Sequence, residues 1–106
     1  TGTMILCTPN NGAIPGLNDD DIVEITCDVS RDACVPHVMP EYDERALELI
    51  RRVKSYERLA AKAVVTGDRN AAIDCLVQHP LVNSYSLAVQ LVDAYFELNR
   101  DYIMHR

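Results

Sequence analysis

The sequence has little of what marks several large classes of protein. It contains no tryptophan and one phenylalanine among its 106 residues. No apolar run approaches the roughly 20 residues that a membrane-spanning helix needs. Ten basic residues stand against 16 acidic ones, and the formal net charge at pH 7 is −6. This balance argues against a general binder of nucleic-acid backbones, because such proteins concentrate Lys and Arg.

Motifs that carry cofactor and redox chemistry are also missing. There is no G-x-G-x-x-G segment to hold a dinucleotide, and no C-x-x-C pair. The opening segment carries no basic residue and no long apolar run of the kind found in signal peptides. The first residue is not Met, so the segment is interpreted as an interior start or an artificial boundary rather than a natural N-terminus. The cysteines are irregularly spaced and are predicted to be free thiols in a reducing compartment; they are Cys7, Cys27, Cys34 and Cys75.

What is present is an ordinary globular composition, 48% hydrophobic and 25% charged, in a length that allows one domain at most. The N-terminal part, residues 1–39, is expected to hold strands and loops. An apolar run at residues 4–7 precedes an Asn-Gly turn signal, and residues 22–29 are rich in β-branched side chains. Residues 34–39 predict a third strand at a sheet edge, broken by Pro36.

Residues 40–106 are expected to be helical. Apolar side chains recur at steps of three and four from Ala46 to Val64. Asp43 predicts the start of this helix and Gly67 its end, because these residues suit the two cap positions. A second helix is expected between Asp68 and Pro80. A third follows Asn83 or Ser84, and its predicted apolar face is Ala88, Leu91, Val92, Tyr95, Leu98 and Tyr102. Strands followed by three helices predict an α+β fold.

The spacing of possible ligands suggests two metal sites to consider, one for zinc and one for calcium. Cys34 and His37 have C-x-x-H spacing, and Cys75 and His79 have C-x-x-x-H spacing on another element. A structural zinc site needs four such ligands together, and nothing in the sequence joins the two pairs. A small zinc domain therefore stays a minor alternative. The acidic run at residues 19–21 lacks the calcium-loop pattern, so a solvated turn is expected there.

The segment Asn10-Asn11-Gly12 follows the first predicted strand directly. Asn and Gly tolerate positive φ, and the Asn amide can both donate and accept hydrogen bonds. One interpretation is a plain turn, since Asn-Gly is common in turns. The other is a loop at a strand end whose amides meet a polar ligand.

Several segments, in order and in spacing, resemble the C-terminal part of the 6-phospho-β-glucosidases of glycoside hydrolase family four. They are N-N-G-A-I at residues 10–14, K-S-Y-E-R at 54–58, A-V-V-T-G-D at 63–68 and H-P-L-V at 79–82. The segment at residues 32–42 fits least well. The resemblance implies the C-terminal portion of a lactate/malate dehydrogenase-like substrate domain, in a fragment whose dinucleotide-binding domain lies outside it.

The resemblance also implies an enzyme that uses NAD and a divalent metal, usually manganese, and departs from the two-carboxylate scheme. Its route is oxidation at C3, elimination of the aglycone, addition of water and reduction. The family's dinucleotide loop, metal ligands and catalytic tyrosine lie upstream of the matched region. No catalytic, cofactor-binding or metal residue is therefore assigned here, neither NAD nor metal is expected on the fragment, and the fragment alone is expected to be inactive. Substrate contact is predicted for Asn10, Asn11 and Gly12.

The implied partners are a phosphorylated disaccharide and further copies of the chain, bound through the helices, with no nucleic acid and no membrane. A phosphorylated substrate implies the cytoplasm, because such sugars form during uptake and stay inside. Two alternatives stay open. One is a freestanding helical interaction or dimerisation module. The other is a family member of the 6-phospho-α-glucosidase or α-galacturonidase type.

Overall fold

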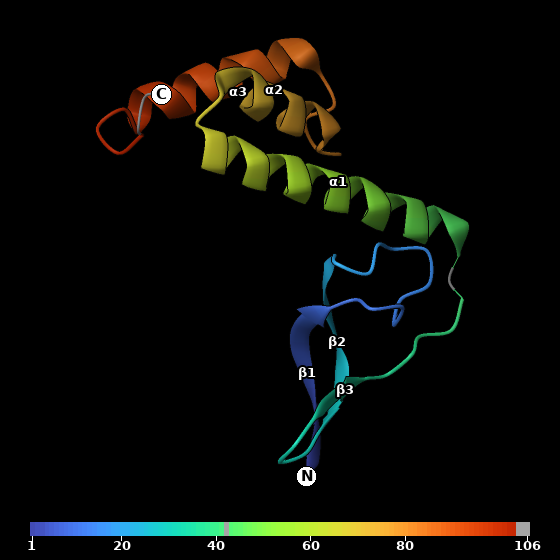
Figure 1. Cartoon of the computed structure of the whole chain (residues 1–106). Helices are drawn as coiled ribbons and strands as arrows, with labels where there is room; N and C mark the ends of the chain where they lie inside the picture. The colour runs from blue at the N-terminus through green and yellow to red at the C-terminus, as the bar shows by residue number, and fades with distance from the viewer. Residues whose placement is uncertain (42, 104–106) are drawn as a thin grey trace. The chain divides into compact units, whose positions relative to one another are not determined.

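The computed structural model describes residues 1–41 and 43–103, which form three strands followed by three helices (Figure 1). This confirms the predicted α+β class. The chain divides into two compact units, Thr1–Leu47 and a second that begins at Glu48. None of the helices in the described ranges is both long enough and apolar enough to cross a bilayer.

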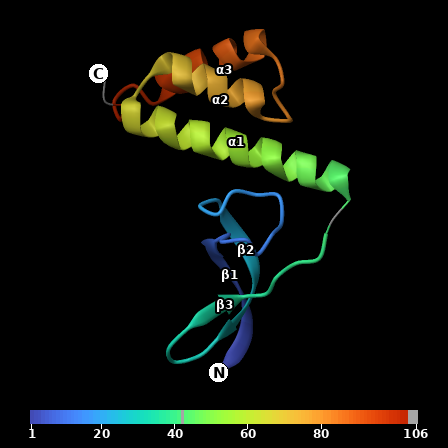
Figure 2. The same cartoon turned by 45° about the vertical axis from the view of Figure 1, so that its right-hand side comes forward.

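The first unit is built on an antiparallel sheet with the strand order β1-β2-β3 (Figure 2). The strands are β1 (Gly2–Pro9), β2 (Ile22–Val29) and β3 (Cys34–Pro36). β2 has the predicted bounds, because its β-branched residues favour extended backbone. β3 is shorter than predicted and ends at Pro36, since proline has no N–H to continue the ladder.

One face of the sheet carries the core of this unit. Along β2 every second side chain is buried, as the period of a strand requires. These side chains pack with Ala13 from the β1–β2 connection and with half-buried side chains around it. The connection therefore folds back over the sheet. The buried set is Ala13, Val23, Ile25 and Cys27, surrounded by Leu6, Ile14, Leu17, Val29 and Met39.

The helices are α1 (Glu44–Thr66), α2 (Arg69–Gln78) and α3 (Tyr85–Leu98). The predicted helix starts are confirmed by hydrogen bonds that the cap side chains accept from main-chain N–H groups. Asp43 accepts from the N–H of Arg45 at 2.9 Å, and Asp68 accepts from Asn70 at 2.9 Å. Ser84, rather than Asn83, caps α3.

Gly67 separates α1 from α2 in the left-handed conformation that the sequence predicts for it, with φ of 66°. Its N–H donates to the carbonyl oxygen of Ala63 at 2.8 Å, which satisfies a carbonyl group at the end of α1. α2 ends at Gln78, just before the His79-Pro80 step, as expected for a residue preceding proline.

The core of the second unit lies where α2 and α3 pack together. Ile73 from α2 is buried with Ala88 and Val92 from α3, and half-buried side chains surround them, namely Ala72, Leu76, Val77, Val82, Val89 and Phe96. The predicted face of α3 was wrong toward its C-terminus. Tyr95 and Leu98 are exposed within this chain, and Val89 and Phe96 take their place.

The exposure of Tyr102 has a separate reason. α3 ends at Leu98, so Tyr102 lies beyond the helix and does not continue its stripe. The apolar face that α3 turns toward α2 thus follows Ala88, Val89, Val92 and Phe96, spaced along consecutive turns of the helix. The periodicity predicted a helix here but did not determine which side packs.

Candidate functional site

The candidate site is the loop at residues 10–21 that connects β1 to β2. Its two ends are joined by main-chain hydrogen bonds. The N–H of Asn10 donates to the carbonyl oxygen of Asp21 at 2.8 Å, and the N–H of Asn11 donates to that of Asp19 at 2.9 Å. Beyond the loop, the N–H of Met39 donates to the carbonyl oxygen of Ala13 at 2.8 Å. The loop is thus held at its base and from one side.

The loop begins with a tight turn, and Asn11-Gly12 form the tip of this turn. The N–H of Ala13 donates to the carbonyl oxygen of Asn10 at 2.9 Å, and φ is 45° at Asn11 and 83° at Gly12. Two consecutive positive φ angles define a type I′ turn, for which Asn-Gly is the preferred pair. The turn interpretation of this segment is therefore confirmed. Both residues are exposed, so the tip presents an amide side chain and a bare peptide to its surroundings.

Asn10 has a different position from its neighbours. It is 0% exposed, and its side chain is fully engaged with the loop backbone. Oδ1 accepts from the N–H of Ile14 at 2.7 Å, while Nδ2 donates to the carbonyl oxygens of Ile14 at 3.1 Å and Leu17 at 3.3 Å. Of the three residues predicted to contact substrate, Asn11 and Gly12 therefore lie at the surface, and Asn10 supports them from beneath.

Asp21 is the second buried polar residue of the loop. Its Oδ2 accepts from the N–H of Asn18 at 3.1 Å, and its own N–H donates to the carbonyl oxygen of Asn18 at 3.2 Å. The sequence predicted a solvated turn at residues 19–21, which holds for Asp19 and Asp20 and is wrong for Asp21. Asp21 extends the alternating buried positions of β2 by one step, and that period could have identified it.

A charged cluster sits toward the far end of β2 from the loop. Asp28 Oδ1 accepts from the Thr3 hydroxyl at 3.0 Å and lies 3.0 Å from His37 Nε2. The hydrogen bond from His37, and then that from Thr3, holds the pKa of Asp28 below its ordinary value. Because the loop lies at the other end of β2, this pair belongs to the sheet and not to the candidate site.

The predicted metal-ligand pairs have other contacts. His37 pairs with Asp28, as above. Cys75 Sγ donates to the carbonyl oxygen of Ala72, and His79 Nδ1 accepts from the N–H of Leu81 at 3.1 Å. Within residues 1–41 and 43–103, no group of three or more His, Cys, Asp or Glu side chains could hold a metal ion.

The helix starts do not fit a dinucleotide either. A pyrophosphate binds at a helix N-terminus that follows a glycine-rich turn. α1 and α2 begin instead at Asp43 and Asp68, whose carboxylates already occupy the helix N-termini, and α3 begins at Ser84. The described residues therefore do not fit NAD or a divalent metal by themselves, and no chemical step through either group is derived from them.

Two of the sequence motifs meet in the second unit. The rings of Tyr56 on α1 and His79 after α2 are 4.7 Å apart in an edge-to-face arrangement. Arg52 Nε donates to the carbonyl oxygen of Gln78 at 3.1 Å, and the Arg52 guanidinium also donates to Asn83 Oδ1. The K-S-Y-E-R and H-P-L-V segments thus meet through Tyr56 and His79. Arg52, which precedes the first segment, joins α1 to the residues on either side of the second, and both contacts are structural.

The second unit also carries an apolar hollow of about 390 Å³ near the C-terminal end of α1. Several exposed apolar side chains lie in and near it, including Val64 and Tyr102, each more than four-fifths exposed. The hollow has almost no polar lining, so it suits an apolar surface better than a sugar. Its lining residues are Ala63, Val64, Val65, Gly67, Ala72, Phe96, Tyr102 and Ile103.

Comparison with known proteins decides the family. Residues 1–82 match the family 4 glycosyl hydrolase C-terminal domain. The chain belongs to this family. This family 4 chain is 35% identical over 96 residues to a probable 6-phospho-β-glucosidase of Bacillus subtilis, covering 91% of this chain and 22% of that protein. It is 35% identical over 99 residues to the 6-phospho-β-glucosidase BglT of Thermotoga maritima, covering 93% of this chain and 24% of that protein.

Solved structures of family 4 enzymes share the fold. A Thermotoga maritima 6-phospho-β-glucosidase with manganese, NAD+ and glucose-6-phosphate matches at a TM-score of 0.87 and 34% identity, over 98% of this chain and 26% of that one. A 6-phospho-α-glucosidase from gut microorganisms with NAD and glucose-6-phosphate matches at a TM-score of 0.89 and 26% identity. This match covers 98% of this chain and 24% of that one. The family 4 chain thus spans about a quarter of its relatives' length, and the resemblance drawn from its motifs is confirmed.

Proposed function

We propose that this chain is part of the C-terminal domain of a 6-phospho-β-glucosidase that depends on NAD and a divalent metal. One observation favours the β-linked substrate. The chain is 35% identical to two 6-phospho-β-glucosidases, but 28%, 26% and 25% identical to relatives named for maltose-6′-phosphate or phospho-α-glucosides. The substrate is then a phosphorylated β-glucoside, and its phosphate keeps it in the cytoplasm.

In this proposal the chain supplies folded support and not the reacting groups. NAD and the metal are held by the rest of the polypeptide, where they supply the redox and Lewis-acid chemistry of the oxidation–elimination–addition–reduction route. The chain by itself then has no hydrolase activity. Its own contribution is a sheet with a fixed loop in the first unit and a helical second unit.

The loop tip is the part of the chain that we assign to the substrate. The support is geometric, because Asn10 and Asp21 hold the loop from inside while Asn11 and Gly12 stay exposed. The Asn11 amide can donate to or accept from a sugar hydroxyl, and the Gly12 peptide allows close approach because no side chain covers it. Asn10 then acts as a positioning residue.

The helices are the part that we assign to a contact between copies of the chain. Leu98 and Tyr102 are 79% and 87% exposed within one chain, and Tyr95 is also exposed. Tyr95 and Leu98 are three residues apart on α3, and Tyr102 follows beyond its end. Exposed apolar side chains grouped in this way commonly mark an interaction surface. The resulting assembly is a homo-oligomer of the complete enzyme.

The substrate assignment is tested by comparing two anomers. The complete polypeptide that carries this chain is supplied with NAD+ and Mn²⁺ and given an aryl 6-phospho-β-glucoside or its α anomer. Faster hydrolysis of the β anomer supports the proposal. Preference for the α anomer would instead favour a 6-phospho-α-glucosidase.

A further inference from the structure

Cys27 and Cys34 lie on neighbouring strands of the first unit. The register places Cys27 opposite Pro36 and Cys34 opposite Val29. Since Cys34 and Pro36 are two residues apart on β3, the side chain of Cys34 points to the same face of the sheet as Cys27. The two cysteines are therefore diagonal neighbours across β2 and β3.

Their thiol groups interact, and they differ in access to solvent. Cys27 is 0% exposed, whereas Cys34 is exposed. Burial, followed by the hydrogen bond between the two thiols, raises the pKa of Cys27. The Cys34 thiol can thus be reached from solution, and Cys27 lies buried on the same face of the sheet.

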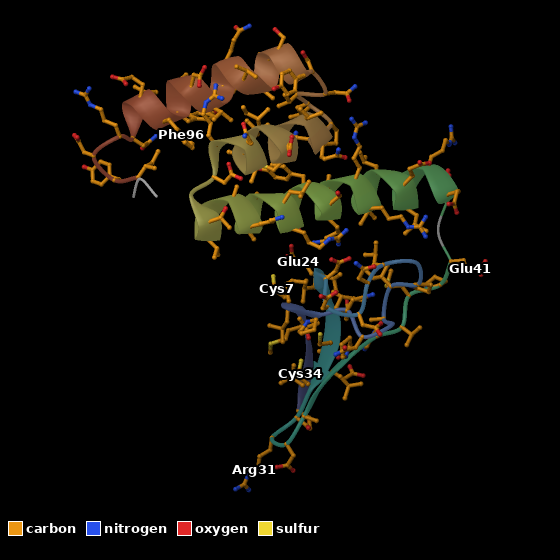
Figure 3. All side chains as sticks on the ribbon, turned by 45° about the horizontal axis from the view of Figure 1, so that its top comes forward. Cys7, Glu24, Arg31, Cys34, Glu41 and Phe96 are labelled. Atoms are coloured by element: carbon orange, nitrogen blue, oxygen red, sulfur yellow. The ribbon has the colours of Figure 1, made fainter. Side chains whose placement is uncertain are left out.

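Cys7 provides an internal comparison. It lies opposite Glu24 in the β1–β2 register. Cys7 and Cys27 are therefore on opposite faces of the sheet. Figure 3 labels Cys7 and Cys34 at separate positions along the sheet. Cys7 is exposed like Cys34 but has no thiol neighbour on its own face among the described residues.

We propose that Cys27 and Cys34 form a reversible disulfide site that reacts with small-molecule disulfides such as oxidised glutathione. The Cys34 thiolate attacks one glutathione sulfur, forms a mixed disulfide and releases one glutathione thiolate. The Cys27 thiolate then attacks Cys34 Sγ, forms the Cys27–Cys34 bond and releases the second glutathione. Two protein thiols are oxidised, one glutathione disulfide is reduced to two thiols, and the two thiol protons pass to the released glutathiones or to water.

Closure of this bond needs a small movement that β3 can make. Diagonal neighbours have Cα atoms about 7–8 Å apart, slightly more than the roughly 4.4–6.8 Å of most disulfides. β3 has three residues, lies at the sheet edge and contains Pro36, which donates no ladder hydrogen bond. Oxidation therefore draws β3 toward β2 and fastens the end of the hairpin. This inference does not depend on the proposed function.

The test maps disulfides in the complete polypeptide after native incubation with oxidised glutathione. Free thiols are blocked by alkylation, and the protein is cut after Arg and after Glu. Arg31 lies between the two cysteines, and Glu24 lies between Cys7 and Cys27, so each cysteine falls in a separate peptide. The expected product joins peptide 25–31 to peptide 32–41 and disappears on reduction with dithiothreitol.

Matched variants separate this site from general thiol oxidation. Cys27→Ser should stop the reaction at a glutathione adduct on Cys34, whereas Cys34→Ser should leave Cys27 unmodified. Cys7→Ser should give the same cross-link as the unaltered protein. Should Cys27→Ser fail to fold, the peptide map of the unaltered protein still decides. A glutathione adduct on Cys34 without the cross-link, a Cys7–Cys34 link, or no modification at all would overturn the proposal.

Discussion

The main-chain N–H of Asn10 donates to the carbonyl oxygen of Asp21 at 2.8 Å, and both residues are buried. This bond closes the β1–β2 loop at the point where the strands separate. The side chains of the same two residues bind other main-chain groups of the loop, at Ile14, Leu17 and Asn18. The Asn11-Gly12 turn is thus held in a fixed conformation at the surface of the first unit.

Replacing Asn10 should destabilise the protein more than replacing Asn11. Asn10→Ala leaves the N–H of Ile14 and the carbonyl oxygens of Ile14 and Leu17 without their partner, and each unsatisfied buried group costs roughly 1–3 kcal/mol. Asn11→Gly is the matched control, because glycine adopts a positive φ without strain. Urea unfolding of the complete polypeptide measures both. Equal midpoints for the two variants would show that Asn10 does not hold the loop.

Replacing Asn11 should lower catalytic efficiency without lowering stability. Asn11→Gly keeps the turn and removes only the side-chain amide, so we expect normal stability and kcat/KM lowered about tenfold, the value of one hydrogen bond of roughly 1.4 kcal/mol. Steady-state kinetics with an aryl 6-phospho-β-glucoside measure the loss. Unchanged kinetics with a folded variant would remove Asn11 from the substrate contacts.

The loop and the helix caps show which features of the fold the sequence predicts. The Asn-Gly turn, the bounds of β2 and the caps at Asp43 and Asp68 were predictable, because each depends on a few neighbouring residues. The cap of the third helix was predicted only as Asn83 or Ser84. The burial of Asp21 follows the period of β2, although a solvated turn was predicted there. The burial of Asn10 was not predicted, since it depends on how the loop folds back over the sheet. For the same reason, periodicity predicted helix α3 but not its packed side.

The hydrogen bonds that Asp28 accepts should make stability depend on acid pH. Its pKa is lowered in the folded state, chiefly by the hydrogen bond from His37, whereas an unfolded Asp titrates near about 3.9. Between these two values the unfolded chain binds more protons, so stability falls as pH decreases through this window and levels off below the folded pKa. Asp28→Asn should reduce this acid-side slope in urea unfolding experiments.

Asp43 provides a second test of the same effect. Its pKa is lowered by the hydrogen bond from the Arg45 main chain and then by that from its side chain. The double variant Asp28→Asn, Asp43→Asn should therefore show a flatter acid limb than either single variant. A full acid slope retained by Asp28→Asn would mean that the His37 contact contributes nothing in solution.

The helical surface should control assembly. Leu98→Glu places a charge on an exposed apolar position of α3, so we expect the complete enzyme to shift toward a smaller species in light scattering coupled to size exclusion. Glu97→Gln, at a neighbouring exposed position, is the control and should leave the mass unchanged. An unaltered mass for Leu98→Glu would exclude this part of α3 from the contact.

The 6-phospho-β-glucosidase activity proposed above belongs to the complete polypeptide that carries this family 4 chain. The most direct measurement is hydrolysis of an aryl 6-phospho-β-glucoside by the complete polypeptide with NAD+ and Mn²⁺, compared with the same glucoside lacking the phosphate. We expect turnover of the phosphorylated compound and little or none of the other. Hydrolysis of the unphosphorylated glucoside at an equal rate, or of neither compound, would contradict the proposed function.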